Sequence, residues 1–227
     1  MRAAAAPAQP AGTDFRREFV EFAMRTGALT FGEFRTKSGR LTPYFFNSGL
    51  FADGARLGEL ATFYARAALA SGIEYDMLFG PAYKGITLAA ATAVALAALG
   101  HNVPYRFNRK EAKDHGEGGA IVGGKLGGRV LIIDDVITDG GAKREALELI
   151  RAAGATPAGV LIALDRQERG AGELSATQEL TRDFGVPVTA IATLADVLAT
   201  LRARAEMRDN VAKIEAYRRE YGVRPEA

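Results

Sequence analysis

The segment from Val130 to Lys143 constrains the fold of this chain more than any other stretch. It reads Val-Leu-Ile-Ile-Asp-Asp-Val-Ile-Thr-Asp-Gly-Gly-Ala-Lys, so a wholly apolar run is followed by two carboxylates and then by a glycine pair. A short run that is apolar at every position is typical of a strand buried on both faces of a parallel sheet. The segment therefore predicts a strand over 129–134, a polar loop, and a helix over 141–153.

Short apolar strands alternate with helices through most of the remaining chain. That alternation indicates βαβ units, in which helices cover a parallel sheet. We therefore predict an α/β fold whose ligands lie outside the carboxyl ends of the strands. A helix over 14–28 and a hairpin over 31–47 precede this pattern. The other predicted strands are 76–79, 103–107, 158–164 and 188–191, and the other predicted helices are 56–70, 84–99, 175–184, 194–203 and 209–221.

The chain has 227 residues and a formal net charge of +2. Its length suits one α/β domain, and its low charge gives no general attraction to nucleic acid. It contains no cysteine, which excludes disulfides and cysteine-based zinc sites. The longest apolar run, near 89–99, is too short to cross a bilayer, and the Ala/Pro-rich residues 1–12 lack the apolar core of a secretion signal. We expect a disordered tail over 1–12 and a cytoplasmic protein with neither nucleic-acid nor membrane partners.

The carboxylates Asp134 and Asp135 and the glycine pair at 140–141 together indicate a ligand site. Backbone N–H groups at a helix N-terminus, and in a glycine-rich loop before it, favour a phosphate. Carboxylates accept hydrogen bonds from the vicinal hydroxyls of a ribose. The alternative interpretation is a solvated strand end followed by a plain loop. The combination favours a site for a ribose that carries a 5′-phosphate.

This whole segment resembles the motif with which type I phosphoribosyltransferases bind 5-phosphoribosyl-1-pyrophosphate (PRPP). The resemblance implies that Asp134 and Asp135 hold the ribose hydroxyls and that the loop up to Ala142 cradles the 5′-phosphate. Many relatives carry threonine where this chain has Gly141, so one hydroxyl contact to the phosphate is expected to be missing. The PRPP-binding residues implied here are Asp134, Asp135, Val136, Ile137, Thr138, Asp139, Gly140, Gly141 and Ala142.

Four further segments resemble the orotate phosphoribosyltransferases in particular, in the family's order and spacing: 37–47, 80–85, 109–119 and 164–170. In the first, the resemblance places Lys37 near PRPP and the Phe45–Phe46 pair at the orotate pocket, with Thr138 also near the base. In the second, Gly-Pro-Ala-Tyr-Lys-Gly leads from a strand into a helix, and Tyr83 and Lys84 meet the pyrophosphate.

The third segment, 109–119, is predicted to be a polar loop rich in cations and glycine. Taken alone, such a charge run is typical of a solvated surface loop. In the family, this loop folds over PRPP, often onto the site of the neighbouring subunit, where its cations stabilise the departing pyrophosphate. The residues that this resemblance assigns are Arg109, Lys110, Lys113 and His115, of which Lys113 and His115 join Asp134 and Asp135 as the expected catalytic residues.

The fourth segment carries Arg166, which the family uses against the orotate carboxylate. A planar guanidinium pairs with a carboxylate through two parallel hydrogen bonds. We expect Asp165 or Glu168 to hold this arginine in place. A neutral purine needs no such partner, which argues against a phosphoribosyltransferase for another base. A non-catalytic PRPP-sensing regulator is the other alternative, although the chain lacks room for an added DNA-binding domain.

The resemblance as a whole implies a type I phosphoribosyltransferase-like parallel sheet flanked by helices, in one domain over 13–227 with a small N-terminal hood over 13–55. It implies transfer of the phosphoribosyl group from PRPP to N1 of orotate, which gives orotidine 5′-monophosphate and pyrophosphate in de novo pyrimidine (UMP) biosynthesis. It also implies a homodimer with a shared active-site loop. Mg²⁺ is the expected cofactor, held mainly by PRPP and water, and no protein metal site is expected.

Overall fold

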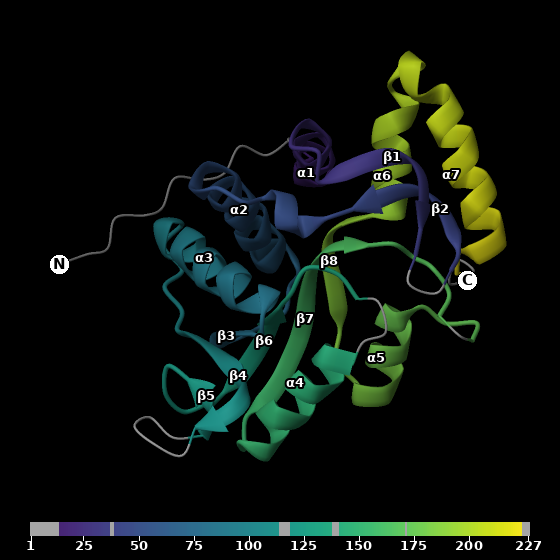
Figure 1. Cartoon of the computed structure of the whole chain (residues 1–227). Helices are drawn as coiled ribbons and strands as arrows, with labels where there is room; N and C mark the ends of the chain where they lie inside the picture. The colour runs from purple at the N-terminus through teal and green to yellow at the C-terminus, as the bar shows by residue number, and fades with distance from the viewer. Residues whose placement is uncertain (1–13, 37–38, 114–118, 138–140, 171, 224–227) are drawn as a thin grey trace.

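The computed structural model of the chain describes residues 14–36, 39–113, 119–137, 141–170 and 172–223. These residues form a twisted central sheet with helices on both faces, and a second, smaller layer at one end (Figure 1). The order of strands in the central sheet is β5-β4-β3-β6-β7-β8. Its strands are β3 (Met77–Gly80), β4 (Tyr105–Lys113), β5 (Gly119–Val122), β6 (Arg129–Ile133), β7 (Thr156–Asp165) and β8 (Val188–Thr193).

Strands β3, β4, β6, β7 and β8 run parallel, as the alternating pattern predicted. Successive side chains of β6 reach opposite faces of the sheet. Leu131 and Ile133 belong to the core beneath α2 (Gly54–Ala70) and α3 (Lys84–Ala98). Val130 and Ile132 belong to the core beneath α4 (Gly141–Ala152) and α5 (Ala176–Phe184). The wholly apolar run is thus explained by burial on both faces.

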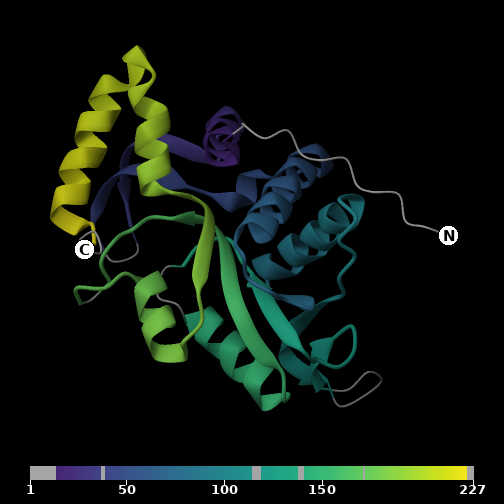
Figure 2. The same cartoon turned by 180° about the vertical axis from the view of Figure 1, so that it is seen from behind.

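The first part of the described chain forms a layer of its own. It consists of α1 (Phe15–Arg25), the antiparallel strands β1 (Leu29–Arg35) and β2 (Leu41–Phe46), and the short helix η1 (Ser48–Leu50). The C-terminal elements α6 (Leu194–Arg202), η2 (Ala205–Met207) and α7 (Arg208–Tyr221) lie beside it (Figure 2). The rings of Tyr44 and Tyr217 meet edge to face at 6.3 Å, so α7 packs on the hairpin. The boundaries of the hood and of the domain stay predictions, and the tail over 1–12 lies outside the described residues.

The segment 109–119 differs from its prediction as a loop. Strand β4 continues to Lys113, and β5, which the sequence did not predict, begins at Gly119 and pairs antiparallel with it. The physical reason is the position of this hairpin at the edge of the sheet. An edge strand tolerates charged side chains, so a strand can carry the polar sequence that suggested a loop.

Several other strand boundaries differ from the prediction by one or two residues. Strand β7 begins at Thr156 and includes Pro157, where the register with β6 shifts; proline is tolerated at such an irregularity near a strand start. Strand β6 ends at Ile133, so Asp134 lies just beyond it. Among the described helices, none combines the length and the apolar character needed to cross a bilayer.

Candidate active site

The site lies where β3, β6 and β7 end at the same edge of the sheet. Gly80 ends β3, Ile133 ends β6 and Asp165 ends β7, and each is followed by the segment that the sequence singled out. Parallel neighbours bring their carboxyl ends together, so the turn at 80–85, the Asp134–Asp135 pair and Arg166 share one edge. The hood hairpin contributes through η1 and β2.

Asp134 is buried and paired with a buried cation. Its Oδ2 lies 2.5 Å from the Nζ of Lys143, which comes from the first turn of α4. The backbone carbonyl of Asp134 accepts a hydrogen bond of 2.7 Å from the hydroxyl of Tyr64 in α2. Burial raises the pKa of the Asp134 carboxyl, and the positive charge of Lys143 opposes that rise. The carboxylate is therefore held by one ammonium in a weakly solvated place.

Asp135 pairs with a different cation. Its Oδ2 accepts hydrogen bonds from Lys84 and from Ser48, both at 2.7 Å, and its Oδ1 accepts one from the N–H of Val136. Burial alone would raise the pKa of this carboxyl. The hydrogen bonds from Lys84, Ser48 and Val136 outweigh burial, so the pKa lies below its ordinary value. Asp135 is consequently an ionised acceptor at neutral pH.

The turn at 80–85 packs against the end of β6 without room for side chains at its two glycines. A Cβ at Gly80 would lie 2.1 Å from the carbonyl oxygen of Gly85. A Cβ at Gly85 would lie 2.6 Å from Pro81 and 2.9 Å from the carbonyl oxygen of Ile133. The amide of Asn108 in β4 also accepts the N–H of Ala82 at 2.9 Å. The glycines thus let the turn approach the Asp134–Asp135 pair.

The cations of β4 lie beside this turn. The ammonium of Lys110 lies 5.7 Å from the ring centre of Tyr83, which is largely exposed. Arg109 precedes it in the same strand, next to Asn108. Two predicted groups of this segment, His115 and the side chain of Lys113, lie outside the described residues. The described part of the hairpin therefore brings Lys110 to the turn that carries Tyr83.

Arg166 lies in a partly buried polar cluster between β7 and the hood. Its Nε and Nη2 donate to Oε1 of Glu168 at 2.9 and 2.8 Å, and its guanidinium lies 4.9 Å from the ring centre of Tyr44. Asp165 instead accepts the N–H of Gln167 and the hydroxyl of Thr177. Of the two acids expected to hold this arginine, Glu168 does so.

The segment around Arg166 is also anchored by the end of α7. The N–H of Arg169 donates to the carbonyl of Tyr221 at 2.8 Å, and the N–H of Val223 donates to the carbonyl of Gln167 at 2.9 Å. Arg40 of the hood donates to the carbonyls of Arg169 and Gly170. Three distant parts of the chain therefore meet at this segment.

The Phe45–Phe46 pair is divided between two environments. Alternation along β2 exposes Phe45, whose ring stacks on that of Phe34 at 5.5 Å. Phe46 is buried beside Phe19 and Phe51 in the core. Phe45 is thus the member of the pair with a face available to a ligand.

The loop between β6 and α4 is described at its two ends. Val136 packs on the core beneath α2 and α3, and Ile137 packs on the core beneath α4. Gly141 and Ala142 open α4. The other residues predicted to bind PRPP or orotate that lie outside the described residues are Lys37, Thr138, Asp139 and Gly140.

Four side chains at the site were missed by the sequence reasoning: Ser48, Tyr64, Asn108 and Lys143. Lys143 is the last residue of the Val130–Lys143 segment, and its spacing from Gly141 would place it in the first turn of the helix. Ser48 follows the aromatic segment of β2 directly. Tyr64 and Asn108 carry no local signal, because their partners are backbone groups remote in the sequence.

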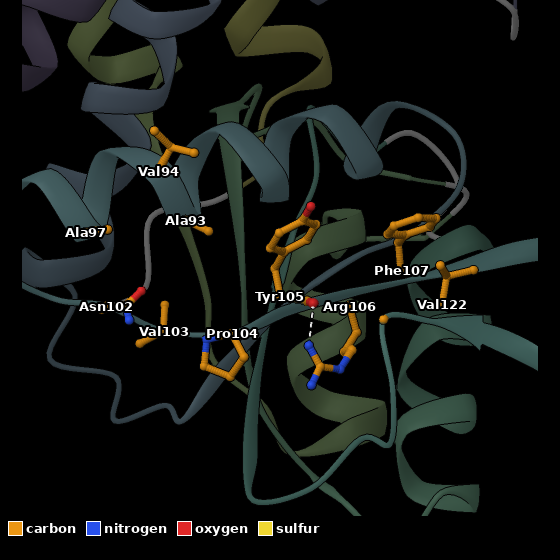
Figure 3. A pocket seen from close by; sticks show the side chains of 11 residues that line it. Ala93, Val94, Ala97, Asn102, Val103, Pro104, Tyr105, Arg106, Phe107 and Val122 are labelled. Carbon is orange, nitrogen blue, oxygen red and sulfur yellow. Dashed lines mark hydrogen bonds between the residues drawn. The ribbon is translucent and has the colours of Figure 1, made fainter. Parts of the chain in front are cut away.

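A pocket of about 540 Å³ lies away from this site, between the second half of α3 and the β4–β5 hairpin (Figure 3). Its walls are mostly apolar and include Val94, Val103, Tyr105 and Val122. Val94 is 72% exposed. None of the lining residues belongs to the carboxylate site, so the pocket marks a separate surface.

Comparison with known sequences places this architecture in a family. The family model of the phosphoribosyl transferase domain matches residues 52–204. An orotate phosphoribosyltransferase of Laribacter hongkongensis is 62% identical over 212 residues, which cover 93% of this chain and 100% of that protein. An orotate phosphoribosyltransferase of Chromobacterium violaceum is 60% identical over 211 residues, which cover 93% of this chain and 99% of that protein.

Solved structures agree with the sequence relatives. The orotate phosphoribosyltransferase of Francisella tularensis superposes with a TM-score of 0.83 at 41% identity, and covers 90% of this chain and 99% of its own. The UMP synthase of Leishmania donovani superposes with a TM-score of 0.70 at 26% identity, over 90% of this chain and 42% of its own. The fold is therefore shared with these proteins.

Proposed function

This chain belongs to the orotate phosphoribosyltransferases, and we propose that its site transfers the phosphoribosyl group of PRPP to N1 of orotate in pyrimidine biosynthesis. The observation that carries the site assignment is the Asp135–Lys84 contact of 2.7 Å. It joins the carboxylates expected to hold ribose to the turn expected to hold pyrophosphate. A single PRPP molecule has both groups, attached to neighbouring carbons.

Different residues at the strand ends contact the two anionic substrates, PRPP and orotate. Asp134 and Asp135 accept the ribose hydroxyls, because an ionised carboxylate accepts strong hydrogen bonds. Lys84, freed from Asp135 by those hydroxyls, turns its ammonium toward the pyrophosphate. Positive charge develops on the ribose ring as the anomeric C–O bond breaks, as in other glycosyl transfers. The chemistry then consists of orientation and electrostatic stabilisation, and it needs no protein nucleophile.

Orotate lies between the hood and the end of β7 in this proposal. Arg166 meets its carboxylate, and the exposed ring of Phe45 contacts its flat face. The cations of 109–113 and His115 stabilise pyrophosphate as it departs. Thr138 to Ala142 and the N-terminus of α4 hold the 5′-phosphate.

Mg²⁺ is proposed as the cofactor because the available donors suit a hard cation. Within the described residues no group of three His, Cys, Asp or Glu side chains could hold a metal ion, so the diphosphate oxygens of PRPP and water would supply most of its ligands. Bound between the diphosphate of PRPP and water, the ion would neutralise charge on the leaving group. Addition of EDTA is expected to abolish turnover, and added Mg²⁺ to restore it.

A homodimer in the cytoplasm is proposed as the working form. Support comes from the apolar surface around Val94 and Tyr105, since an exposed apolar patch is typical of an interface. Tyr105 begins β4, the strand that leads to the loop expected to be shared. Two inactive variants, Lys113→Ala and Asp135→Asn, should regain part of the activity when their subunits are mixed and exchanged. No recovery after proven exchange would contradict a shared loop.

The reaction itself is tested by mixing the purified protein with PRPP, Mg²⁺ and orotate and following the loss of orotate ultraviolet absorbance. Uracil and adenine are the control bases, and Asp135→Asn is the control protein. Rapid loss with orotate alone supports the proposal. Turnover of adenine instead would indicate a phosphoribosyltransferase for another base, and PRPP binding without turnover would indicate a regulator.

A further inference from the structure

Lys143 is a buried cation that has no direct role in the proposed reaction. The residue is 7% exposed, and its Nζ lies 2.5 Å from Oδ2 of Asp134 and 2.7 Å from the carbonyl oxygen of Val136. Lysine is almost never buried unless it is paired, because the desolvation of its ammonium costs several kcal/mol. An apolar side chain would avoid that cost, so stability alone does not account for a lysine here.

The two partners of this ammonium lie on either side of Asp135. One is the side chain of Asp134 and the other is the backbone of Val136, so the contact spans the peptide units that carry the Asp135 carboxylate. Lys143 itself belongs to α4, which follows the loop after Val136 and Ile137. One side chain therefore ties the residues before the phosphate loop to the helix after it.

Position in the helix adds a second constraint. Lys143 is the third residue of α4, where the helix dipole disfavours a cation. The contact with Asp134 offsets this effect and directs the ammonium back toward the end of β6.

Given that proposed function, we infer that Lys143 is a positioning residue for PRPP: its ammonium fixes the Asp134 carboxylate and the Val136 carbonyl, so that the two carboxylates present a fixed pair of acceptors to the ribose. Without Lys143, the buried Asp134 has no cation partner within the described residues. The charged and titratable groups around it are then Asp135, Lys84 beyond Asp135, and Tyr64 from α2.

The test compares Lys143→Met, which keeps the length and removes the charge, with Arg144→Met as the matched control. Arg144 is the next residue of α4, and it pairs with Asp183 and Glu179 instead of with Asp134 or Asp135. Loss of a charge-assisted hydrogen bond to Asp134 is expected to raise the KM for PRPP about tenfold or more, with a smaller change in kcat. The acid limb of kcat/KM for PRPP should also move to higher pH, because a buried carboxyl without its cation takes up a proton more readily. The control should change neither quantity.

A double variant separates positioning from a merely structural role. When Lys143→Met is added to Asp134→Asn, the KM for PRPP and the acid limb of kcat/KM are expected to stay at their values in Asp134→Asn alone. The comparison of Asp134→Asn with the double variant also tests the inference if Lys143→Met alone does not fold, because the double variant removes both buried charges together. A wild-type KM and acid limb in Lys143→Met, or a further tenfold loss in the double variant, overturns the inference.

Calorimetric titration with PRPP and Mg²⁺ keeps this test independent of the proposed reaction. If wild type and Arg144→Met bind PRPP but do not convert orotate, the proposed function fails, and the effect of Lys143→Met on binding still tests positioning. Weaker binding in Lys143→Met supports the inference. Unchanged binding in that variant overturns it.

Discussion

Tyr44 and Arg166 donate to the same oxygen, Oε1 of Glu168, while the guanidinium of Arg166 lies 4.9 Å from the centre of the Tyr44 ring. Burial disfavours the charge of Arg166, but Tyr44 and Glu168 outweigh it and hold the pKa above the ordinary arginine value. The hood is therefore joined to the end of β7 through one carboxylate. The position of Arg166 depends on that contact.

Glu168→Gln should weaken this junction. The change leaves the partly buried guanidinium without its carboxylate, and loss of hydrogen bonds to a charged group costs about 1.5–3 kcal/mol. We expect a lower melting temperature and a higher KM for orotate. Glu173→Gln is the control, because Glu173 is an exposed partner of Arg169 and should change neither. Calorimetry and initial rates measure both effects, and an unaltered melting temperature would contradict the role of Glu168.

Arg166→Ala should raise the KM for orotate far more than the KM for PRPP. Hydrogen bonds to a charged group contribute about 1.5–3 kcal/mol, which corresponds to roughly ten- to hundredfold in KM. Arg182→Ala, an exposed arginine on α5, is the control. An orotate KM that stays at its wild-type value would remove Arg166 from the orotate pocket.

Lys113→Ala should mainly lower kcat. The segment that carries this residue is expected to act on the departing pyrophosphate, so its cations stabilise the transition state more than the bound substrates. Single-turnover rates at saturating PRPP and orotate measure the effect. A normal kcat would show that the segment does not take part in the chemical step.

Gly80→Ala should displace the turn at 80–85. Its Cβ would lie 2.1 Å from the carbonyl oxygen of Gly85, a backbone atom that cannot move alone. We expect a lower melting temperature and a loss of kcat/KM for PRPP. Gly58→Ala is the matched control: it lies in α2 with nothing within 4 Å of the added Cβ. In a helix that change stabilises by up to about 1 kcal/mol, so opposite shifts for the two variants are the expected result.

Acid stability should depend on Asp76, far from the site. Hydrogen bonds from the side chain and backbone of Arg129 lower the pKa of Asp76 to about 2. A carboxyl with a lowered pKa stabilises the fold above its unfolded pKa of about 3.9, and that contribution is lost as the pH falls toward the folded value. Asp76→Asn should therefore lower the melting temperature at neutral pH and flatten its fall between those two values. An unchanged acid profile in the variant would exclude this linkage.

The sequence predicted the parts of the fold in which burial sets the pattern. The apolar run of β6 and the helical spacing of α2 and α3 were sufficient for an α/β fold, which is confirmed. Strand β5 was missed because an edge hairpin can be polar throughout, and Pro157 hid the start of β7. The resemblance of short segments to a known family identified Lys84, Asp135 and Arg166 as expected site residues. It could not show their partners Ser48 and Tyr44, because those contacts depend on how the hood packs on the sheet.

The anchoring of the Arg166 segment by α7 has a consequence for the order in which the protein is made. A nascent chain that ends before Arg208 already contains the strands, the carboxylate pair and the turn at 80–85. It still lacks the carbonyl of Tyr221 that holds Arg169 and the N–H of Val223 that holds Gln167. Translation therefore completes the surroundings of the Asp134–Asp135 pair first, and the Arg166 segment is anchored only when α7 leaves the ribosome.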